Sequence, residues 1–273
     1  MLKITDQEFK QLTAYIKQNF GIHLQAEKKT MLTGRLQSLL LSKNFTRFSE
    51  YIDYLLNDKS GEARMELVEK ITTNHTFFMR EADHFFFFRD HVLPELVQNN
   101  QEQDLRIWCA ACSTGEEAYT LAMIIADYFG ADKGRWDTRI LATDISQQVL
   151  ETARKGIYSL ERIAPLPAAW RNKYFHKLDG ENAVLSSSIK NEVIFRKFNL
   201  MEPVFPFRRK FQVIFCRNVM IYFDWETKTE LVNKFYEHLE EGGYLFVGHS
   251  ESLNREKTKF EYIRPAVYRK SNA

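Results

Sequence analysis

The second half of the chain alternates short apolar runs with longer amphipathic stretches, and this alternation limits the fold more than any other feature. The apolar runs have β-strand character and fall at 105–109, 139–142, 193–198, 213–216 and 244–247. Helical patterns separate several of them, at 116–128, 146–154 and 225–239. Such alternation predicts a parallel α/β sheet covered by helices. Because ligands of these sheets bind beyond the carboxyl ends of the strands, the residues after each run are the candidates for chemistry.

The first 70 residues follow a different pattern, in which apolar residues recur at helical spacing. Thr5 and Ser49 are expected N-caps, and Gly21 is an expected helix end. We therefore predict three parts: an all-helical N-terminal domain over 1–70, a linker over 71–90 that contributes to the ligand site, and an α/β domain over 91–273. No Pro/Gly/Ser-rich tether separates the two domains.

Composition narrows the setting in which such a chain works. No run approaches the roughly 20 apolar residues that span a bilayer, and the start of the chain has no apolar signal core, so a cytoplasmic protein is expected. Three cysteines argue against a disulfide framework. The net charge of +2 does not favour nucleic-acid binding. Residues 10–47, however, hold seven basic residues against one acid, which points to an acidic partner.

The loop after the first predicted strand has an unusual charge. It contains a single glycine, Gly115, and the following helix opens with Glu116 and Glu117. A dinucleotide pyrophosphate needs a helix N-terminus free of competing anions, so these glutamates would repel it. The same loop suits S-adenosylmethionine, which carries an ammonium and a sulfonium instead. Asp144 follows the second strand, where a carboxylate can accept both ribose hydroxyls.

Two other interpretations of these residues stay open on sequence grounds. Glu116 and Glu117 can be favourable charges in a first helical turn, and Asp144 can be an N-cap. Cys109 and Cys112 form a C-x-x-C between a strand and a helix, which resembles a thioredoxin-type redox site. Against a redox site, Cys109 still belongs to the apolar strand, whereas that chemistry needs an exposed cysteine at a helix N-terminus.

Five motifs in this order resemble one known family. They are Thr-Thr-Asn-His-Thr-Phe-Phe-Met-Arg-Glu at 72–81, Ala-Cys-Ser-Thr-Gly-Glu-Glu-Ala-Tyr at 111–119, Ala-Thr-Asp-Ile at 142–145, Phe-Cys-Arg-Asn-Val-Met-Ile-Tyr-Phe at 215–223 and Gly-His-Ser-Glu-Ser at 248–252. Together they closely resemble the chemotaxis receptor methyltransferase (CheR) family over nearly the whole chain. The resemblance implies a Rossmann-like S-adenosylmethionine-dependent methyltransferase domain, a small all-α N-terminal domain, and a small antiparallel β insertion, expected near 174–194.

The resemblance also implies a set of cofactor-binding residues, most of which lie beyond predicted strand ends. The linker contributes Asn74, Thr76 and Arg80, and the first two strands are followed by Gly115, Glu117 and Asp144. The third and fourth strands are followed by Asn199, Leu200, Arg217, Asn218 and Val219. No metal ligands are expected.

The implied reaction transfers a methyl group from S-adenosylmethionine to a glutamate carboxylate of a chemotaxis receptor. A glutamate with a pKa of about 4.3 is already ionised at neutral pH, so no general base is needed. We hypothesise that Arg80 and the hydroxyl of Tyr222 orient the acceptor carboxylate. The alternative is that Arg80 only packs the junction between the two domains.

The expected partner is the cytoplasmic helical region of the receptor, docked by Lys28, Lys29 and Arg35, although a solvated helix face also explains these charges. In some members of the family a glycine-rich loop of the insertion binds a peptide at the receptor C-terminus. This chain has only the short turn 178–181, so we predict no such binding. A monomer that neither binds nucleic acid nor inserts into membranes is expected. A nucleic-acid methyltransferase and a non-catalytic cofactor-sensing regulator are the competing functions.

Overall fold

The computed structural model describes residues 2–254 and 256–271, and it divides into two compact units. The first unit consists of the chain up to Thr73 together with Asn199–Met201 and Tyr222–Lys228. The second unit consists of Asn74–Phe198, Glu202–Ile221 and the chain from Thr229 onward. Each unit is described by itself below.

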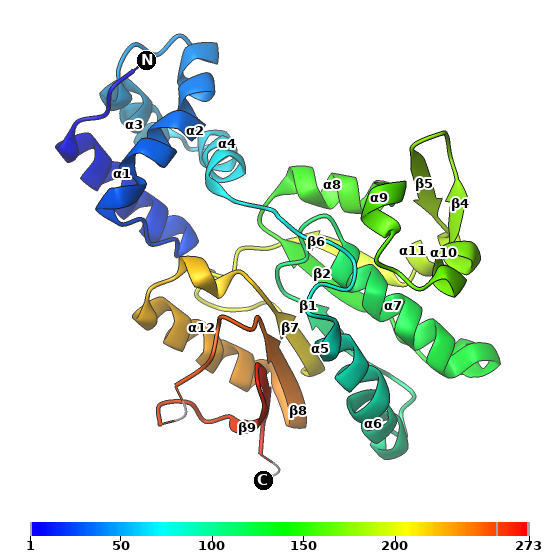
Figure 1. Ribbon diagram of the computed structural model, residues 1–273. Helices are drawn as coiled ribbons and strands as arrows, with labels where there is room; N and C mark the ends of the chain where they lie inside the picture. Colours follow the sequence, from blue (N-terminus) through cyan, green and yellow to red (C-terminus); the bar gives the residue numbers. More distant parts are fainter. Residues whose placement is uncertain (1, 255, 272–273) are drawn as a thin grey trace. The chain divides into compact units, whose positions relative to one another are not determined.

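The first unit is all-helical, as predicted (Figure 1). Its elements are α1 (Asp6–Phe20), η1 (Ala26–Lys28), α2 (Lys29–Ser42), α3 (Phe48–Asn57) and α4 (Glu62–Ile71). Thr5 caps α1 in a capping box with Glu8, and Gly21 ends the helix with a φ of 71°, so both predicted ends are confirmed. Ser49 is not an N-cap, because α3 already begins at Phe48.

The second unit is built on a seven-stranded sheet with the order β6-β2-β1-β7-β8-β10-β9. The strands are β1 (Ile107–Cys109), β2 (Ile140–Asp144), β6 (Val193–Lys197), β7 (Phe211–Cys216), β8 (Leu239–Val247), β9 (Glu261–Arg264) and β10 (Val267–Arg269). The first five strands of this order are parallel, which confirms the predicted parallel sheet, and β10 and β9 add an antiparallel edge that was not predicted.

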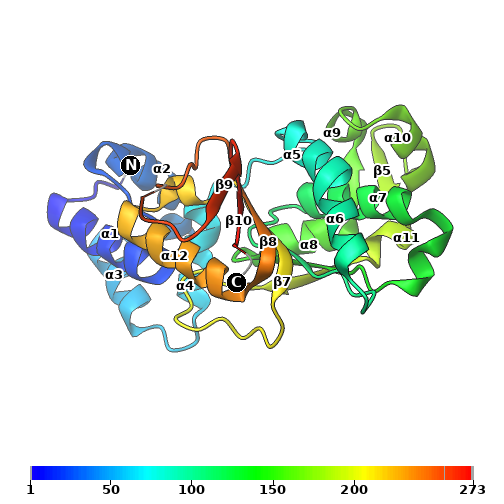
Figure 2. The ribbon, with the colours of Figure 1, turned by 90° about the horizontal axis from the view of Figure 1, so that it is seen from below.

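Helices of the second unit cover the sheet. They include α5 (Ala82–Phe87), the π-helical turn η2 (Phe88–Val92), α6 (Leu93–Asn99), α7 (Glu116–Phe129), η3 (Gly130–Arg135) and α8 (Gln147–Lys155), followed by η4 (Met220–Tyr222) and α12 (Trp225–His238), which the two units share. Figure 2 shows α5 and α6 as a nearly continuous rod beside α7. Among the described residues, no helix is both long and apolar enough to cross a membrane.

Alternate side chains of β1 enter two different cores. Ile107 and Cys109 belong to the large apolar core that also contains residues of α5 and α7. Trp108 lies in an aromatic cluster on the other side, and its indole N–H donates to Thr143 Oγ1 at 2.9 Å. The rings around Trp108 are those of Phe198, Phe205, Phe207, Phe211 and Phe235, with centroid distances of 4.8 to 5.9 Å. The central strand is therefore held firmly on both faces.

A second, antiparallel sheet forms the insertion, with the order β3-β5-β4. Its strands are β3 (Ile157–Ser159), β4 (Phe175–Lys177) and β5 (Asn182–Leu185), and the helices beside it are α9 (Leu160–Ile163), α10 (Ala168–Tyr174) and α11 (Ser187–Lys190). The insertion thus begins earlier than the expected 174 and ends before 194, because Val193 and Ile194 already pair with β2 in the large sheet. Residues 178–181 form the short turn of the β4–β5 hairpin.

Candidate functional site

The carboxyl ends of β1 and β7 lie next to each other at the centre of the large sheet. From β1 the sheet continues through β2 to β6 on one side, and from β7 it continues to β8 on the other. Ligands of open α/β sheets bind at such a topological switch point. The loops that follow these two strands begin at Ala110 and Arg217, so the predicted residues of both loops belong to this place in the fold.

The loop after β1 is held by its backbone and by one glycine. Cys112 N–H donates to Thr143 O at 2.9 Å, which ties the loop to the end of β2. Gly115 has a φ of 95°, and a Cβ at this position would lie 2.9 Å from the Cβ of Ala153 in α8. The glycine therefore permits the start of α7 to pack against α8. Its contact with the cofactor stays a prediction.

Glu116 and Glu117 are neighbours in sequence but have different surroundings. The side chain of Glu116 is fully buried, accepts a hydrogen bond from Thr114 Oγ1 at 2.7 Å and forms an ion pair with Arg162. Burial raises the pKa of Glu116, and the charge of Arg162 opposes that rise. Glu116 therefore serves the fold, in agreement with the structural interpretation of this residue.

Glu117 belongs to a cluster centred on Arg217, whose side chain is 2% exposed. Arg217 Nη1 donates to Glu117 Oε2 at 2.9 Å, and Arg217 Nη2 donates to Glu81 Oε2 at 3.0 Å and to the carbonyl oxygen of Arg80. Glu81 Oε1 in turn accepts from Asn218 Nδ2 at 3.0 Å. This cluster, which we call the Arg217 cluster (Arg80, Glu81, Glu117, Arg217 and Asn218), joins the linker to the loops after β1 and β7.

The Arg217 cluster holds two carboxylates against one buried guanidinium. Burial raises the pKa of Glu117 in spite of the Arg217 charge. Burial alone would also raise the pKa of Glu81, but hydrogen bonding from Asn218 and the charge of Arg217 outweigh it and lower this pKa to about 2. Two carboxylates against one guanidinium leave a net negative charge, which favours a cation. This net charge is smaller than the loop sequence alone suggests, because Glu116 and Glu117 each have an arginine partner.

Left-handed backbone conformations are concentrated at this end of the sheet. Seven described residues other than glycine have a positive φ. Met79 (62°), Glu81 (55°) and Asn218 (60°) lie in the Arg217 cluster or next to it in sequence, and Ser113 (47°) lies in the loop after β1. Each such residue costs about 1–3 kcal/mol when the conformation is strained, and such residues gather at functional sites. The backbone conformations and the charges therefore indicate the same position for the functional site.

Asp144 ends β2 and organises the neighbouring loops. Its side chain is almost fully buried, with Oδ2 accepting from Ser113 N–H at 2.8 Å and Oδ1 accepting from Ser146 N–H at 3.0 Å. Ser113 Oγ donates to the carbonyl oxygen of Asn74 at 3.0 Å. Asp144 is therefore linked through Ser113 to the linker.

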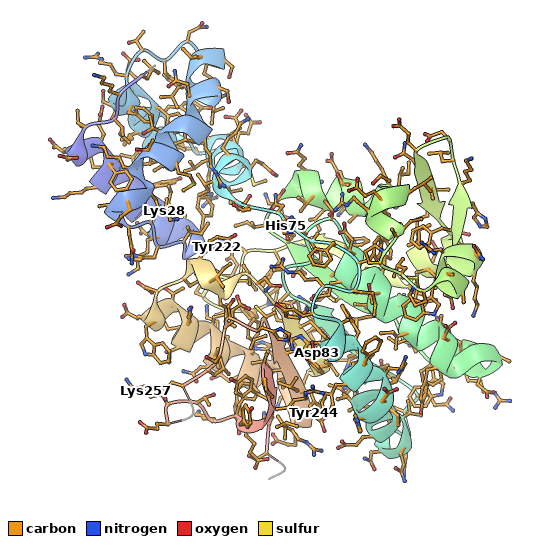
Figure 3. The ribbon with its side chains drawn as sticks, viewed as in Figure 1. Lys28, His75, Asp83, Tyr222, Tyr244 and Lys257 are labelled. Atoms are coloured by element: carbon orange, nitrogen blue, oxygen red, sulfur yellow. The ribbon has the colours of Figure 1, made fainter. Side chains whose placement is uncertain are left out.

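The linker that carries Arg80 is anchored by its aromatic residues. Phe78 is fully buried, with its ring 4.9 Å from Tyr158 and 5.8 Å from Phe175 of the antiparallel insertion. Arg80 Nη1 donates to the carbonyl oxygen of His75 at 2.7 Å, and His75 marks the course of the linker in Figure 3. The predicted Thr76 lies on the same stretch and is half-buried.

Three predicted residues make their contacts in the first unit. Asn199 Nδ2 donates to the carbonyl oxygen of Asn19 at 2.8 Å, and Leu200 is buried. The carbonyl oxygen of Tyr222 accepts from His23 N–H at 2.8 Å. The roles proposed for these residues therefore stay predictions.

The C-x-x-C pair does not form a redox site. Cys109 and Cys112 are free thiols and fully buried, and burial raises the pKa of both well above the ordinary value. A thioredoxin-type cysteine needs the opposite, an accessible thiol with a lowered pKa. The two residues are packed thiols.

Sequence reasoning missed the acidic residues that hold the loop after β7. Glu251 is 3% exposed, and its carboxylate accepts from the backbone N–H groups of Gly248 and Asn218, both at 2.7 Å, and of Ile221 at 3.1 Å. Burial raises the pKa of Glu251. The bonded residues Asn218 and Ile221 lie on either side of Val219 in the sequence. Val219 is half-buried and is a predicted cofactor contact. Glu251 lies in the fifth motif and Glu81 ends the first, so both could have been singled out from the motifs.

The Arg217 cluster fits a ligand that carries both an ammonium and a carboxylate. Arg217 Nε is buried and has no hydrogen-bond partner among the described residues, so this donor is left for an acceptor such as a carboxylate. Glu117 offers a carboxylate to an ammonium. The amino-acid end of S-adenosylmethionine has both groups, and its ribose hydroxyls match Asp144.

Comparison with known proteins gives two family matches that together cover most of the chain. Residues 7–72 match the all-alpha domain of the CheR methyltransferases, and residues 74–268 match the S-adenosylmethionine-binding domain of the same family. The chain is 44% identical to the chemotaxis protein methyltransferase of Borreliella burgdorferi over 99% of this chain and 96% of that protein. It is 36% identical to the chemotaxis protein methyltransferase of Escherichia coli over 98% of this chain and 92% of that protein. The chain therefore belongs to the CheR methyltransferase family and uses S-adenosylmethionine as its cofactor.

Proposed function

We propose that this protein methylates glutamate side chains of methyl-accepting chemotaxis receptors in the cytoplasm. The products are a glutamyl methyl ester and S-adenosylhomocysteine. The single observation that carries the proposal is the Arg217 cluster, which joins the linker to the loops at the switch point in a chain of the CheR family. This cluster offers paired charges to the cofactor and contains no group that would have to move a proton.

The absence of a required proton transfer follows from the chemistry of the acceptor. When bound, S-adenosylmethionine would supply a sulfonium methyl group to the acceptor carboxylate, with the electron pair of the broken carbon–sulfur bond kept by the sulfur of S-adenosylhomocysteine. A receptor glutamate is ionised at neutral pH, so this protein contributes alignment and charge placement. Glu117 holds the ammonium, Arg217 the carboxylate and Asp144 the ribose hydroxyls.

Arg80 and Tyr222 orient the acceptor carboxylate in this proposal. The guanidinium of Arg80 has five N–H donors, of which one, on Nη1, is bonded to His75 O among the residues that the structure describes, which leaves donors for an anion. A bidentate arginine sets the plane of a carboxylate, and a hydroxyl adds a further hydrogen bond. Since both groups are donors, neither competes with the acceptor for the methyl group.

Of the three basic residues proposed to dock the receptor, Lys28 is exposed, and the other two also bond to neighbouring residues of the first unit. Lys29 Nζ pairs with Asp6 Oδ1 at 2.6 Å, and Arg35 Nη2 donates to Thr73 Oγ1 at 2.8 Å. Arg35 also donates to the carbonyl oxygen of Ile71 at the end of α4, so part of its role is structural. If docking is electrostatic, added salt weakens receptor methylation while cofactor affinity changes little.

The test incubates the protein with methyl-labelled cofactor and receptor-containing membranes and follows base-labile release of methanol. The proposal expects label in the receptor, and none in a receptor whose acceptor glutamates are replaced by alanine. Label in RNA or DNA would instead support a nucleic-acid methyltransferase. Cofactor binding without transfer would support a sensing regulator. No binding of the cofactor or its demethylated product by folded protein in calorimetry would overturn all three.

A further inference from the structure

A group of potential metal ligands lies beside the Arg217 cluster. One ligand atom from each of Glu81, His84 and His249 falls within 4.8 Å of the other two. His84 is fully buried, and neither of its ring nitrogens has a hydrogen-bond partner among the described residues. A buried imidazole with two unsatisfied nitrogens is costly, so a bound group explains it better than packing does.

We infer that Glu81, His84 and His249 form a binding site for a divalent transition-metal ion, of which Zn²⁺ is the representative. Two imidazoles and a carboxylate are a ligand set that such ions prefer. Three protein ligands leave one position of a tetrahedral ion for water. Neither the fold nor the methyl transfer requires this ion, so the site is a property of this chain in addition to its proposed function.

The spacing of the ligands supports the site. Glu81 is the N-cap of α5, with a left-handed backbone, and His84 is the third residue of the helix, so the two side chains meet where the helix begins. His84 Nδ1 is 3.5 Å from Glu81 Oε2. A tetrahedral zinc ion with bonds of about 2.0–2.1 Å needs ligand atoms roughly 3.3 Å apart, so these two atoms already have the required separation. The ring of His249 lies 4.7 Å from that of His84, centroid to centroid, and its side chain is 47% exposed.

The surroundings of His249 add a second feature of metal sites. Asp83 Oδ1 lies 3.2 Å from His249 Nε2, and Asp83 Oδ2 lies 3.7 Å from Arg264 Nη2. A carboxylate that contacts one nitrogen of an imidazole orients the ring and makes the other nitrogen a better ligand. Asp83 stands at the start of α5, where Figure 3 labels it.

Glu81 couples this site to the Arg217 cluster. Its Oε2 accepts from Arg217 Nη2 at 3.0 Å and its Oε1 accepts from Asn218 Nδ2 at 3.0 Å, so a metal ion must share or displace these donors. Since both the ion and the guanidinium are positive, occupancy of the metal site weakens the hold of Glu81 on Arg217. This part of the inference rests on the proposed function, and it predicts that metal and S-adenosylmethionine weaken each other's binding by the same factor.

The first test measures metal binding by the full chain without cofactor. We expect one equivalent of Zn²⁺ in calorimetry, and Co²⁺ to give the visible absorption band of a nitrogen- and oxygen-ligated ion. His249→Ala should weaken both by at least about tenfold, because it removes one of three ligands. His176→Ala, an exposed histidine of β4, is the matched control and should bind as the wild type does. Absence of the band, or equal binding by the two variants, overturns the site.

The second test separates the site from its coupling. The affinity for S-adenosylmethionine is measured with and without saturating Zn²⁺, in the wild type and in His249→Ala. A decrease of at least about fivefold in the wild type alone supports the coupling. Equal affinity in a wild type that binds Zn²⁺ overturns the coupling. Failure to bind S-adenosylmethionine under both conditions overturns the proposed function instead, since the metal test needs no cofactor.

Discussion

Two buried glutamate–arginine pairs stand side by side at the start of α7, and they differ in what they connect. Glu116 pairs with Arg162, which is 38% exposed, and both side chains form hydrogen bonds with the hydroxyl of Thr114. Glu117 pairs with Arg217, which is 2% exposed and also holds Glu81 and the backbone of the linker. The first pair completes a local fold, whereas the second ties three segments of the candidate site together.

The difference shows that residue type alone does not decide the role of a charge. Burial raises the pKa of both Glu116 and Glu117, and an arginine opposes the rise in both. What separates them is the number of segments that meet at the arginine. Substitutions at the two arginines should therefore have different consequences, and the predictions below test that difference.

The largest effect is expected for Arg217→Ala. Removal of this guanidinium leaves two carboxylates unpaired in a buried site, which should lower the free energy of unfolding by about 3–5 kcal/mol and abolish measurable cofactor binding. Urea unfolding followed by circular dichroism gives the first quantity and calorimetry the second. Arg196→Ala, at an exposed position of β6, is the control and should change stability by less than about 0.5 kcal/mol. If Arg217→Ala lowered the free energy of unfolding by less than about 1 kcal/mol, the two carboxylates of the cluster would not depend on this guanidinium.

The next effect is a pH dependence that belongs to Glu81. The pKa of this carboxyl is lowered from 4.5 to about 2 in the folded protein, so its ionised form stabilises the fold above pH 4.5, and this contribution is lost as the pH falls toward 2. Glu81→Gln should therefore be less stable than the wild type by up to about 3 kcal/mol at neutral pH, with the gap closing toward pH 2. Urea unfolding of both proteins between these limits measures the gap. A constant gap would contradict the lowered pKa.

A smaller loss is expected for Arg162→Ala. Glu116 stays fully buried without its partner, which should cost about 2 kcal/mol, less than at Arg217 because Arg162 is partly exposed and its charge is screened by water. Cofactor affinity at a temperature where the variant is folded should stay within about twofold of the wild type. A variant that loses the cofactor as completely as Arg217→Ala would erase the distinction between the two pairs.

The smallest of these effects concerns Arg80, whose carbonyl oxygen belongs to the Arg217 cluster and whose side chain is proposed to orient the acceptor. Arg80→Ala should reduce methyl transfer at least about tenfold, or about 1.4 kcal/mol of transition-state stabilisation. Because Arg80 is also a predicted cofactor contact, the rate is measured at saturating cofactor, where a loss of affinity no longer contributes. Arg80→Lys restores charge without the bidentate geometry and should recover only part of the rate. An unaffected rate at saturating cofactor would remove Arg80 from the orientation of the acceptor, and a loss confined to cofactor affinity would leave it as a cofactor-binding residue only.

Periodicity predicted the central part of the fold well and its margins poorly. The five parallel strands were found because each contains at least three consecutive apolar residues. Strand β9 was missed because its residues are largely exposed and show no alternation, and β3, the first strand of the insertion, has only three residues. Short or edge strands are defined by their neighbours in the sheet, and the local sequence carries little information about them.

The candidate site was predicted as a set of residue types at strand ends, not as a set of contacts. The sequence placed Glu117 and Arg217 beyond the first and fourth predicted strands, and the structure shows that these strands are neighbours and that the two residues meet although they are 100 residues apart. It did not show that Arg162 neutralises Glu116, because this contact depends on the insertion that follows α8. It also did not bring His84 and His249 together, since they lie on different elements and only the folded chain makes them neighbours.

The indole of Trp108 gives this protein an optical probe of its own. This side chain is fully buried among aromatic rings and donates to Thr143, the residue before Asp144. Its fluorescence is therefore shielded from acrylamide, whereas Trp225, at 47% exposed, is open to quenching. With the half-buried Trp136 and Trp170 replaced by phenylalanine, the emission that resists quenching comes from a tryptophan hydrogen-bonded to the residue before Asp144, so events at that end of the sheet become visible without any added label.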